Sequence, residues 1–280
     1  MDRRTVVLAV ACATLLAGCG GVAGGGVAGG DVDDRATVNP ALAGTPTASP
    51  TPTPAPSYPP GVDADGVDVE TLIAEHNEAL WRTSSAVRFS RTVVAANGTT
   101  LATRRSVTES DDERVRYRVE VDGAPPGSSP PGFASFAFWT NGSVTVVQSV
   151  DDAGNASSWE VSSLPETDDT PDDSGEDLLI DAFAGTEPRL VNATAVDGEE
   201  LSVLRVEHER LNRTDRRPLR NVSGTLYVTD EGVVREYRLR YTATYDTESG
   251  PVTATTTERF RVTVGDATAT APDWVTTATD

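Results

Sequence analysis

Apolar and polar side chains alternate along much of the chain beyond residue 100, with a period of two. At 115–121 valine and tyrosine alternate with arginine and glutamate, and at 237–245 tyrosine, leucine and alanine alternate with arginine and threonine. Strands with one apolar and one charged face form antiparallel sheets that are wetted on one side. The pattern predicts strands at 101–107, 114–121, 133–139, 144–150, 189–196, 201–207, 224–229, 233–245 and 253–264.

Short turn sequences separate several of these strands. Asn97-Gly98 and Asn141-Gly142 are dipeptides that favour two-residue hairpin turns, because both central residues of such a turn need a positive φ. An Asp-Glu-Gly turn at 230–232 joins two further strands, and residues 111–113 join another pair. The strands are therefore predicted to pair largely with their sequence neighbours.

Two segments have the period of a helix instead. At 69–81 the apolar residues and His76 recur near one face, with Asp68 as the predicted N-cap. Residues 174–177 resemble a capping box, and they lead into a short apolar helix at 178–184 that ends at Gly185. The order is thus helix, strands, helix, strands.

This order predicts an α+β, mostly β fold. Its simplest form is one large, curved antiparallel sheet, a half-barrel, whose apolar concave face is covered by the two helices. A two-sheet β-sandwich is the alternative, and the amphipathic opening helix argues mildly against it.

The N-terminus has the pattern of an exported lipoprotein. A short cationic segment precedes an apolar run from Val6 to Leu16, which is too short to span a bilayer and fits a signal peptide. Leu-Ala-Gly-Cys at 16–19 is a lipobox, so residues 1–18 are predicted to be removed and Cys19 to carry a lipid. Arg3-Arg4 leaves both general and twin-arginine export open.

A low-complexity segment follows the lipobox. Residues 19–61 are rich in glycine and then in proline and threonine, a composition that forms no hydrophobic core and favours extended chain. We interpret this segment as a tether, and residues 62–280 as an extracellular β-rich domain.

Charge and cysteine content describe the environment of the protein. The net charge is −20, and all 23 basic residues are arginine. Such an excess of acid repels nucleic acid and stays compact most easily in concentrated salt, where the Debye length falls to about 3 Å. The composition indicates a salt-loving organism. The two cysteines, Cys12 and Cys19, precede the domain, which excludes thiol catalysis and cysteine-bound metals within it.

The chain also contains six Asn-X-Ser/Thr sequons with no proline at X. An exported chain with this many sequons favours surface glycosylation, and the asparagines are then predicted to be exposed. The candidate positions are Asn97, Asn141, Asn155, Asn192, Asn212 and Asn221.

Motifs that carry chemistry are missing from the sequence. His208 begins a zincin-like His-Glu segment without the second histidine, and no nucleophile elbow, Walker loop or dinucleotide fingerprint occurs. His76 is interpreted as packing on the inner face of its helix, and His208 as solvated in an arginine-rich loop. Carboxylates at 63–70 have calcium-like spacing but lack the EF-hand pattern. The sequence predicts no catalytic residue, metal or cofactor.

The ordered set of features resembles a known group of proteins. The lipobox, the Pro/Thr tether, the opening helix at 72–80, the hairpin at 226–234 and the closing Pro-Asp-Trp-Val at 272–275 look like a family of haloarchaeal surface lipoproteins. The arrangement is also similar to that of Lol-type lipoprotein carriers and mycobacterial lipid-binding lipoproteins. The first resemblance implies no activity; the second implies a half-open barrel with an apolar cavity for acyl chains.

Three functions follow as hypotheses. The first is a non-enzymatic, membrane-anchored surface lipoprotein, monomeric, that binds a lipid or other apolar ligand on the concave face of its sheet. The second is a structural or interaction module of the cell envelope that uses glycans and charge on its solvent face, and the third, an extracellular hydrolase, has the least support. Six arginines between 205 and 220 either meet anionic headgroups or phosphate, or form a hairpin loop that pairs with the acidic stretch. The candidate ligand residues are Trp81, Trp139, Tyr237, Leu239 and Tyr241.

Overall fold

A computed structural model describes residues 58–111, 114–128, 130, 132–161, 174–196, 198–212, 217–265 and 267–279. The predicted signal peptide, the lipid site Cys19 and the tether up to residue 57 lie outside the described residues. Residues 55–280 form a compact unit of their own, and its strand pairs, helices and hydrophobic clusters lie within the described part. The domain is therefore self-contained.

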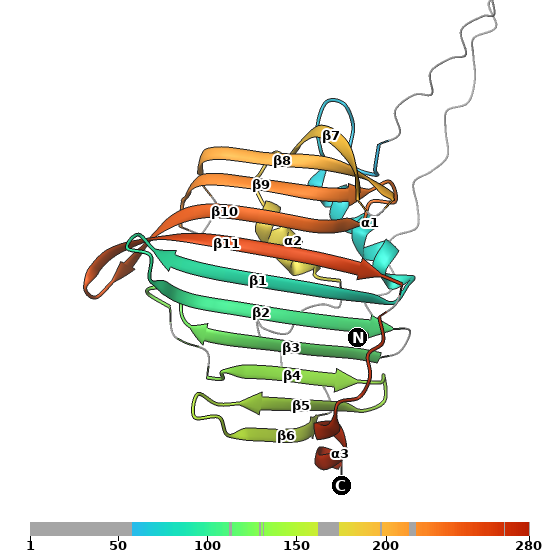
Figure 1. The fold of residues 1–280 in the computed structure, drawn as a ribbon, viewed down its shortest axis with the longest axis vertical. Coiled ribbons are helices and arrows are strands. Elements are labelled where there is room, and N and C mark those ends of the chain that lie inside the picture. Colours follow the sequence, from blue (N-terminus) through green and yellow to red (C-terminus); the bar gives the residue numbers. More distant parts are fainter. Residues whose placement is uncertain are drawn as a thin grey trace, which may run out of the picture. The chain divides into compact units, whose positions relative to one another are not determined.

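The domain is built on one antiparallel sheet of eleven strands, as Figure 1 shows. The first six strands follow helix α1 (Val69–Trp81), and the last five follow helix α2 (Glu176–Phe183). The strands are β1 (Ser85–Ala95), β2 (Thr100–Asp111), β3 (Arg114–Gly123), β4 (Ser135–Thr140), β5 (Thr145–Val150), β6 (Ala156–Val161), β7 (Arg189–Val196), β8 (Glu199–Leu211), β9 (Leu219–Thr229), β10 (Val234–Thr247) and β11 (Gly250–Val264). A short C-terminal helix, α3, spans Asp273–Thr279.

The sheet consists of two meanders, β1–β6 and β7–β11, which meet where the first strand of the chain pairs with the last. Its order is β6-β5-β4-β3-β2-β1-β11-β10-β9-β8-β7. All adjacent strands in this order are neighbours in sequence except the pair β1 and β11. Phe89 lies opposite Phe260 at this junction. The prediction of a single large curved sheet is confirmed, and the β-sandwich alternative is wrong, because β1 and β11 join the two halves edge to edge.

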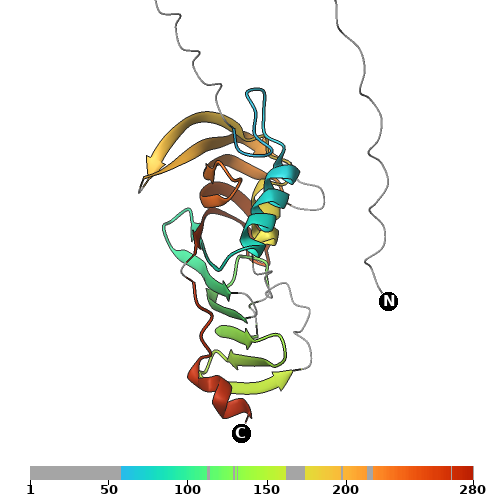
Figure 2. The ribbon, with the colours of Figure 1, turned by 90° about the vertical axis from the view of Figure 1, so that its right-hand side faces the viewer.

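Helices α1 and α2 cover one face of the sheet (Figure 2), which we call the helix-side face; the opposite face is the outer face. Helix α1 begins as predicted, because the Asp68 carboxylate accepts a hydrogen bond of 3.1 Å from the Thr71 N–H. Helix α2 begins at Glu176, two residues before the predicted start at 178, with Gly175 at φ +80° in the N-cap position. The buried apolar residues of both helices face the sheet, whereas Trp81 and Ile180 are exposed.

His76 joins the two helices to the sheet. Its ring is 0% exposed; Nδ1 accepts a hydrogen bond from the Val234 N–H at 3.1 Å, and Nε2 lies 3.2 Å from the Ser174 carbonyl oxygen. The predicted inward position of His76 is confirmed, and the ring fastens β10 and the segment before α2 to α1.

The predicted hairpins are present, and the structure adds elements that the pattern did not predict. Asn97-Gly98, Asn141-Gly142 and residues 230–232 lie between paired strands. Strands β1 and β6 and helix α3 were not predicted. The residues at 58–61 pack with the domain, since the Asp68 N–H donates to the Gly61 oxygen at 2.7 Å.

None of the helices formed by the described residues has both the length and the apolar character needed to cross a membrane.

Candidate functional site

The helix-side face carries two separate apolar clusters. The covered cluster lies under α1 and α2 on β1 and β8–β11, and it is filled by large side chains. Tyr237, for example, stacks on Phe260 with ring centroids 5.1 Å apart and meets Phe183 of α2 edge-on at 5.3 Å. This part of the face is the core of the domain.

The second cluster, here called the aromatic cluster, lies on the same face further along the sheet. Its buried members are Tyr117, Val119, Phe136, Phe138 and Val147 of β3, β4 and β5. Val115, Val121, Phe133 and Val161 pack around these residues and are only partly buried.

The rings of the aromatic cluster form a connected group. Tyr117 and Phe138 have ring centroids 5.5 Å apart, and Phe133 and Phe136 are 5.8 Å apart. Of the three helices among the described residues, α1 contacts α2, and α3 contacts β5 and β6 beside a different cluster on the outer face. The aromatic cluster is therefore an apolar region of the helix-side face beyond the two covering helices.

Strand β2 separates the two clusters. Between Arg104 and the end of the strand, its helix-side face carries small polar side chains: Ser106 lies between Phe89 and Val119, and Thr108 lies between Val87 and Tyr117. Such residues do not extend an apolar core, which is why one sheet carries two hydrophobic clusters and not one.

A charged group lies on the same face at the β1–β11 junction. Glu258 is 3% exposed, and its Oε1 accepts hydrogen bonds from Arg91 Nε at 2.8 Å and from the Tyr241 hydroxyl at 2.9 Å. Burial, together with the Glu258 carboxylate, raises the pKa of Tyr241 above its usual value. Burial opposes the charge on Arg91, but Glu258 outweighs it and raises the pKa of Arg91. The charges of Arg91 and Glu258 balance each other, and the neutral Tyr241 hydroxyl donates a further hydrogen bond to the carboxylate.

The five candidate ligand residues do not form one site. Tyr237 and Leu239 are buried in the covered cluster, and Tyr241 beside them donates to Glu258. Trp139 lies on the outer face, where its Nε1–H donates to the Ala269 oxygen at 3.0 Å under the C-terminal segment. Trp81 is 79% exposed at the end of α1. The aromatic cluster, which contains none of the five, is the candidate site in their place.

Several histidine, arginine and aspartate residues that the sequence offered as candidates for chemistry lie in strands and turns. His208 lies in β8 opposite Val222, and Arg210 and Arg220 lie in β8 and β9, so the prediction of a solvated arginine-rich loop here is wrong. Arg205 lies in a strand, as predicted. Asp63 Oδ1 accepts from the N–H groups of Asp65 and Gly66, which makes it a turn residue. Within the described ranges no three His, Cys, Asp or Glu side chains lie close enough to hold a metal ion.

All six sequon asparagines are exposed, as glycan acceptors must be. Asn97 and Asn141 lie in hairpin turns and accept hydrogen bonds there from Thr99 N–H and Ser143 N–H. Asn221 has φ +49°, a left-handed value, at the bulge where β9 and β10 change register. The predicted exposure is confirmed.

Comparison with known proteins gives similarity of structure alone. Neither protein-family models nor curated proteins match the chain. Solved structures similar to it include a LolA superfamily protein from Nitrosomonas europaea, at 12% identity over 75% of this chain and 97% of that one with a TM-score of 0.24. A DUF1329 family protein from Desulfovibrio piger is similar at 9% identity over 70% of this chain and 90% of that one, with a TM-score of 0.23. The sheet order and the two covering helices define the fold of this domain (Figure 2).

Proposed function

We propose that this protein is a membrane-tethered, non-enzymatic binding module of the cell surface, and that its aromatic cluster takes the chain of a lipid or another apolar ligand. Export by residues 1–18 and a lipid on Cys19 hold the domain at the outer face of the membrane in this proposal. The domain acts as a monomer and needs no cofactor.

One observation carries the proposal: the helix-side face has a second apolar cluster that α1 and α2 do not cover. The helices fill the space over the covered cluster, whereas the aromatic cluster lies on β3–β5, beyond both. Partly buried Val115, Val121, Phe133 and Val161 surround its buried rings. The five buried members are at most 7% exposed, so an apolar ligand would first meet the cluster at its four partly buried residues.

The energetics suit a lipid chain. Each methylene group removed from water contributes about 0.8 kcal/mol. A chain that buries roughly ten methylenes gains about 8 kcal/mol before the cost of association is subtracted. Aromatic rings add contact area without charged groups that an acyl or isoprenoid chain would have to desolvate.

Native mass spectrometry tests the proposal. The protein is purified from its own host in concentrated salt, extracted gently, and compared before and after organic solvent. We expect bound mass that the solvent removes and that has the composition of a lipid. A domain that carries only glycan mass in such a preparation argues against the proposal.

The envelope interaction module is the second candidate, and it is favoured by a different observation, the arginines of the outer face. A hydrolase has less support, because His76 makes structural contacts with Val234 and Ser174. Isolation of the protein as a strict monomer would count against the interaction module, and a stable partner in crosslinked membranes would count for it.

A further inference from the structure

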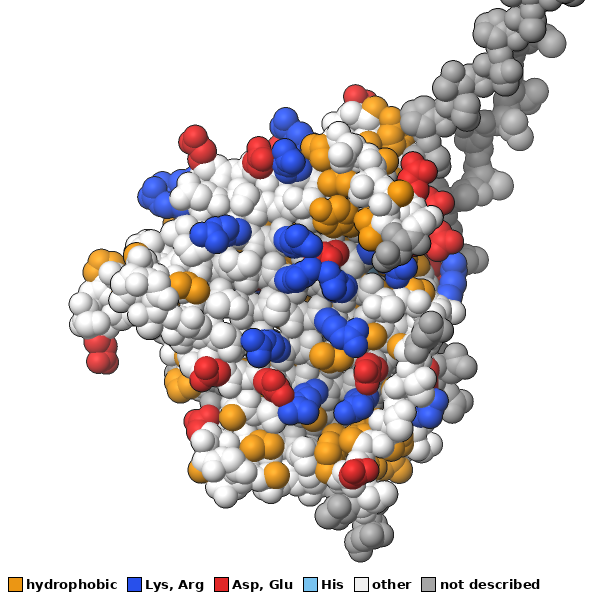
Figure 3. Space-filling model, in the orientation of Figure 1, with side chains coloured by type: hydrophobic (Ala, Val, Ile, Leu, Met, Phe, Trp, Pro, Cys, Tyr) orange, Lys and Arg blue, Asp and Glu red, His pale blue; other side chains and the backbone are white. Residues whose placement is uncertain are grey.

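The outer face carries a concentration of positive charge on a protein whose net charge is −20. Six arginines lie on four adjacent strands near the middle of the sheet, and Figure 3 shows blue side chains gathered over the middle of the outer face. We call this set the arginine patch; it consists of Arg88 of β1, Arg105 of β2, Arg238 and Arg240 of β10, and Arg259 and Arg261 of β11.

The strand register places these arginines close to one another. Arg88 lies directly opposite Arg261, and Arg238 lies directly opposite Arg259. Like charges in direct cross-strand positions destabilise a sheet. The fold therefore maintains two unfavourable pairs on the same face, although glutamate is abundant elsewhere in the chain.

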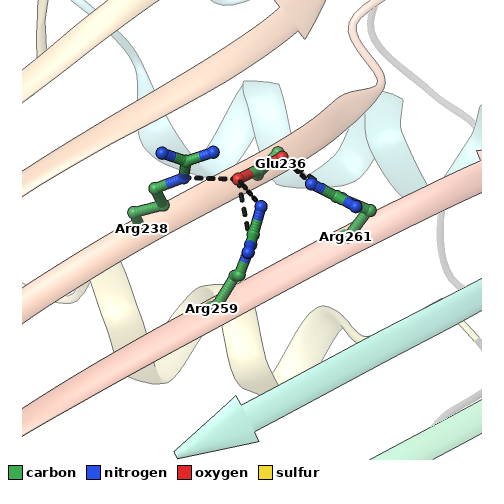
Figure 4. A network of polar contacts seen from close by, with 4 residues as sticks. All are labelled: Glu236, Arg238, Arg259 and Arg261. Carbon is green, nitrogen blue, oxygen red and sulfur yellow. Dashed lines mark hydrogen bonds and ion pairs between the residues drawn. The ribbon is translucent and has the colours of Figure 1, made fainter.

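One glutamate lies within the patch and compensates only part of it. Glu236 Oε2 lies 2.8 Å from Arg261 Nη2, and its Oε1 lies 3.1 Å from Arg259 Nη2 and 2.5 Å from Arg238 Nε (Figure 4). Burial alone would raise the pKa of Glu236, but the hydrogen bonds from Arg261 and Arg238 lower it below the usual value. Six arginines and this carboxylate have a formal charge of +5, and Glu120 of β3 borders the patch directly opposite Arg105.

The remaining arginines surround two shallow hollows. Arg88, Arg105 and Arg240 form no ion pair with any other residue that the structure describes. Four arginines, Arg88, Arg105, Arg259 and Arg261, line a hollow of about 260 Å³ around Ser90. Arg238 and Arg240 line a second hollow of about 240 Å³ together with Arg205 and Glu207, whose charged atoms lie 3.9 Å apart. Each hollow offers several guanidinium groups to one oxyanion.

We propose that the arginine patch docks the domain on the phosphate headgroups of an anionic membrane surface. Arginine binds phosphate through two parallel N–H···O bonds, so the patch has the chemistry that phosphate requires. The patch extends over four strands of a sheet face and contains two hollows, which suits an array of headgroups better than one small ion. Contact through short hydrogen bonds also persists in concentrated salt, where long-range attraction is screened.

The chain's own length is compatible with this contact. If Cys19 carries a lipid, as the proposed function has it, the segment from Cys19 to Tyr58 reaches at most about 140 Å. This reach allows the outer face to meet the membrane. The inference shares only the tether with the proposed function, because the arginine patch and the aromatic cluster lie on opposite faces of the sheet.

Vesicle binding by the tether-free domain, residues 55–280, tests the inference. Cosedimentation is measured with phosphatidylglycerol vesicles and with phosphatidylcholine vesicles, from 0.15 M to 2 M salt. We expect binding to phosphatidylglycerol alone, and an affinity at least about tenfold lower for the variant R88Q/R105Q/R259Q. Loss of the lipid ligand from the aromatic cluster would leave this result unchanged, so the two proposals fail separately.

A second triple variant controls for the total charge. R82Q/R189Q/R210Q removes three exposed arginines outside the patch and is expected to bind phosphatidylglycerol like the wild type. Equal loss in both variants, equal binding to both lipids, or no binding to either lipid would overturn the proposal. So would binding of inositol hexakisphosphate by the patch without vesicle binding, which would indicate a soluble polyanion as the occupant.

Discussion

Arg91 and Glu258 are direct cross-strand partners at the junction of the two meanders, and their side chains meet on the helix-side face with Nε 2.8 Å from Oε1. The Glu258 side chain is 4% exposed and that of Arg91 is 31% exposed. A buried carboxylate is tolerated in a sheet only when its charge is compensated. The pair therefore stabilises the one strand contact that joins the halves of the sheet.

Removal of one partner is expected to destabilise the domain strongly. Arg91→Met leaves Glu258 buried without its cation and should lower the free energy of unfolding by about 3–5 kcal/mol. Denaturant unfolding followed by fluorescence measures the change. The double variant R91M/E258M should recover much of the loss, because it removes both charges; strictly additive losses would show that the two residues do not interact.

His76 is predicted to be essential for stability and not for binding. His76→Phe keeps the ring volume but leaves the Val234 N–H and the Ser174 carbonyl without the imidazole, which should cost about 3 kcal/mol of unfolding free energy. Glu75→Gln, at an exposed position one residue earlier, serves as the control and should change stability by less than about 0.5 kcal/mol. A folded, equally stable H76F protein would contradict the structural role.

Stability should fall in acid through Asp111. Burial alone would raise the pKa of this carboxyl, but hydrogen bonds from Arg114 and from the Ala269 N–H lower it below its unfolded value of 3.8. The ionised form thus stabilises the fold above about pH 4, and this stabilisation is lost as the pH falls through the folded pKa. Asp111→Asn should lose about 1–2 kcal/mol at pH 7 and less at pH 3.

Unfolding experiments between pH 3 and pH 7 measure this difference in concentrated salt. Asp122→Asn, at an exposed position on neighbouring β3, is the matched control and should follow the wild type at every pH. A constant difference between D111N and wild type across the range would rule out the assigned linkage.

The C-terminal segment is predicted to shield Trp139. Truncation after Gly265 removes the Ala269 oxygen that accepts from the indole, together with Trp274 and Val275 of the same cluster. In a background with Trp81→Phe, Trp159→Phe and Trp274→Phe, only Trp139 emits, and the truncation should shift its emission to longer wavelength and make it more accessible to acrylamide. Emission unchanged by the truncation would mean that Trp139 is buried by other residues.

Local patterns predicted much of the fold. Period-two strands and Asn-Gly turns are determined by neighbours in sequence, and nearly all strands pair with sequence neighbours. Strand β6 was missed because both of its faces are exposed or half-buried, which removes the alternation. Helix α3 was missed because it is short and rich in threonine, which has a low helix propensity.

Positions that depend on register could not be predicted in the same way. Phe136, Ala137, Phe138 and Trp139 are all buried, so their sequence does not tell which of them faces the helices and which the outer side. The two charges of Arg91 and Glu258 look solvent-facing in sequence, and only the pairing of β1 with β11 brings them together. The arginine patch likewise gathers residues from strands far apart in the chain.

Binding of a fluorescent fatty-acid probe to residues 55–280 tests whether the aromatic cluster takes an apolar ligand. The variant F133E/V161E places carboxylates at the rim of the aromatic cluster, and V191E/V196E places them at two exposed apolar positions of β7. We expect saturable binding by the wild type and by V191E/V196E, and binding at least about tenfold weaker by folded F133E/V161E. Equal binding by all three proteins, or no saturable binding by the wild type, would contradict the proposal.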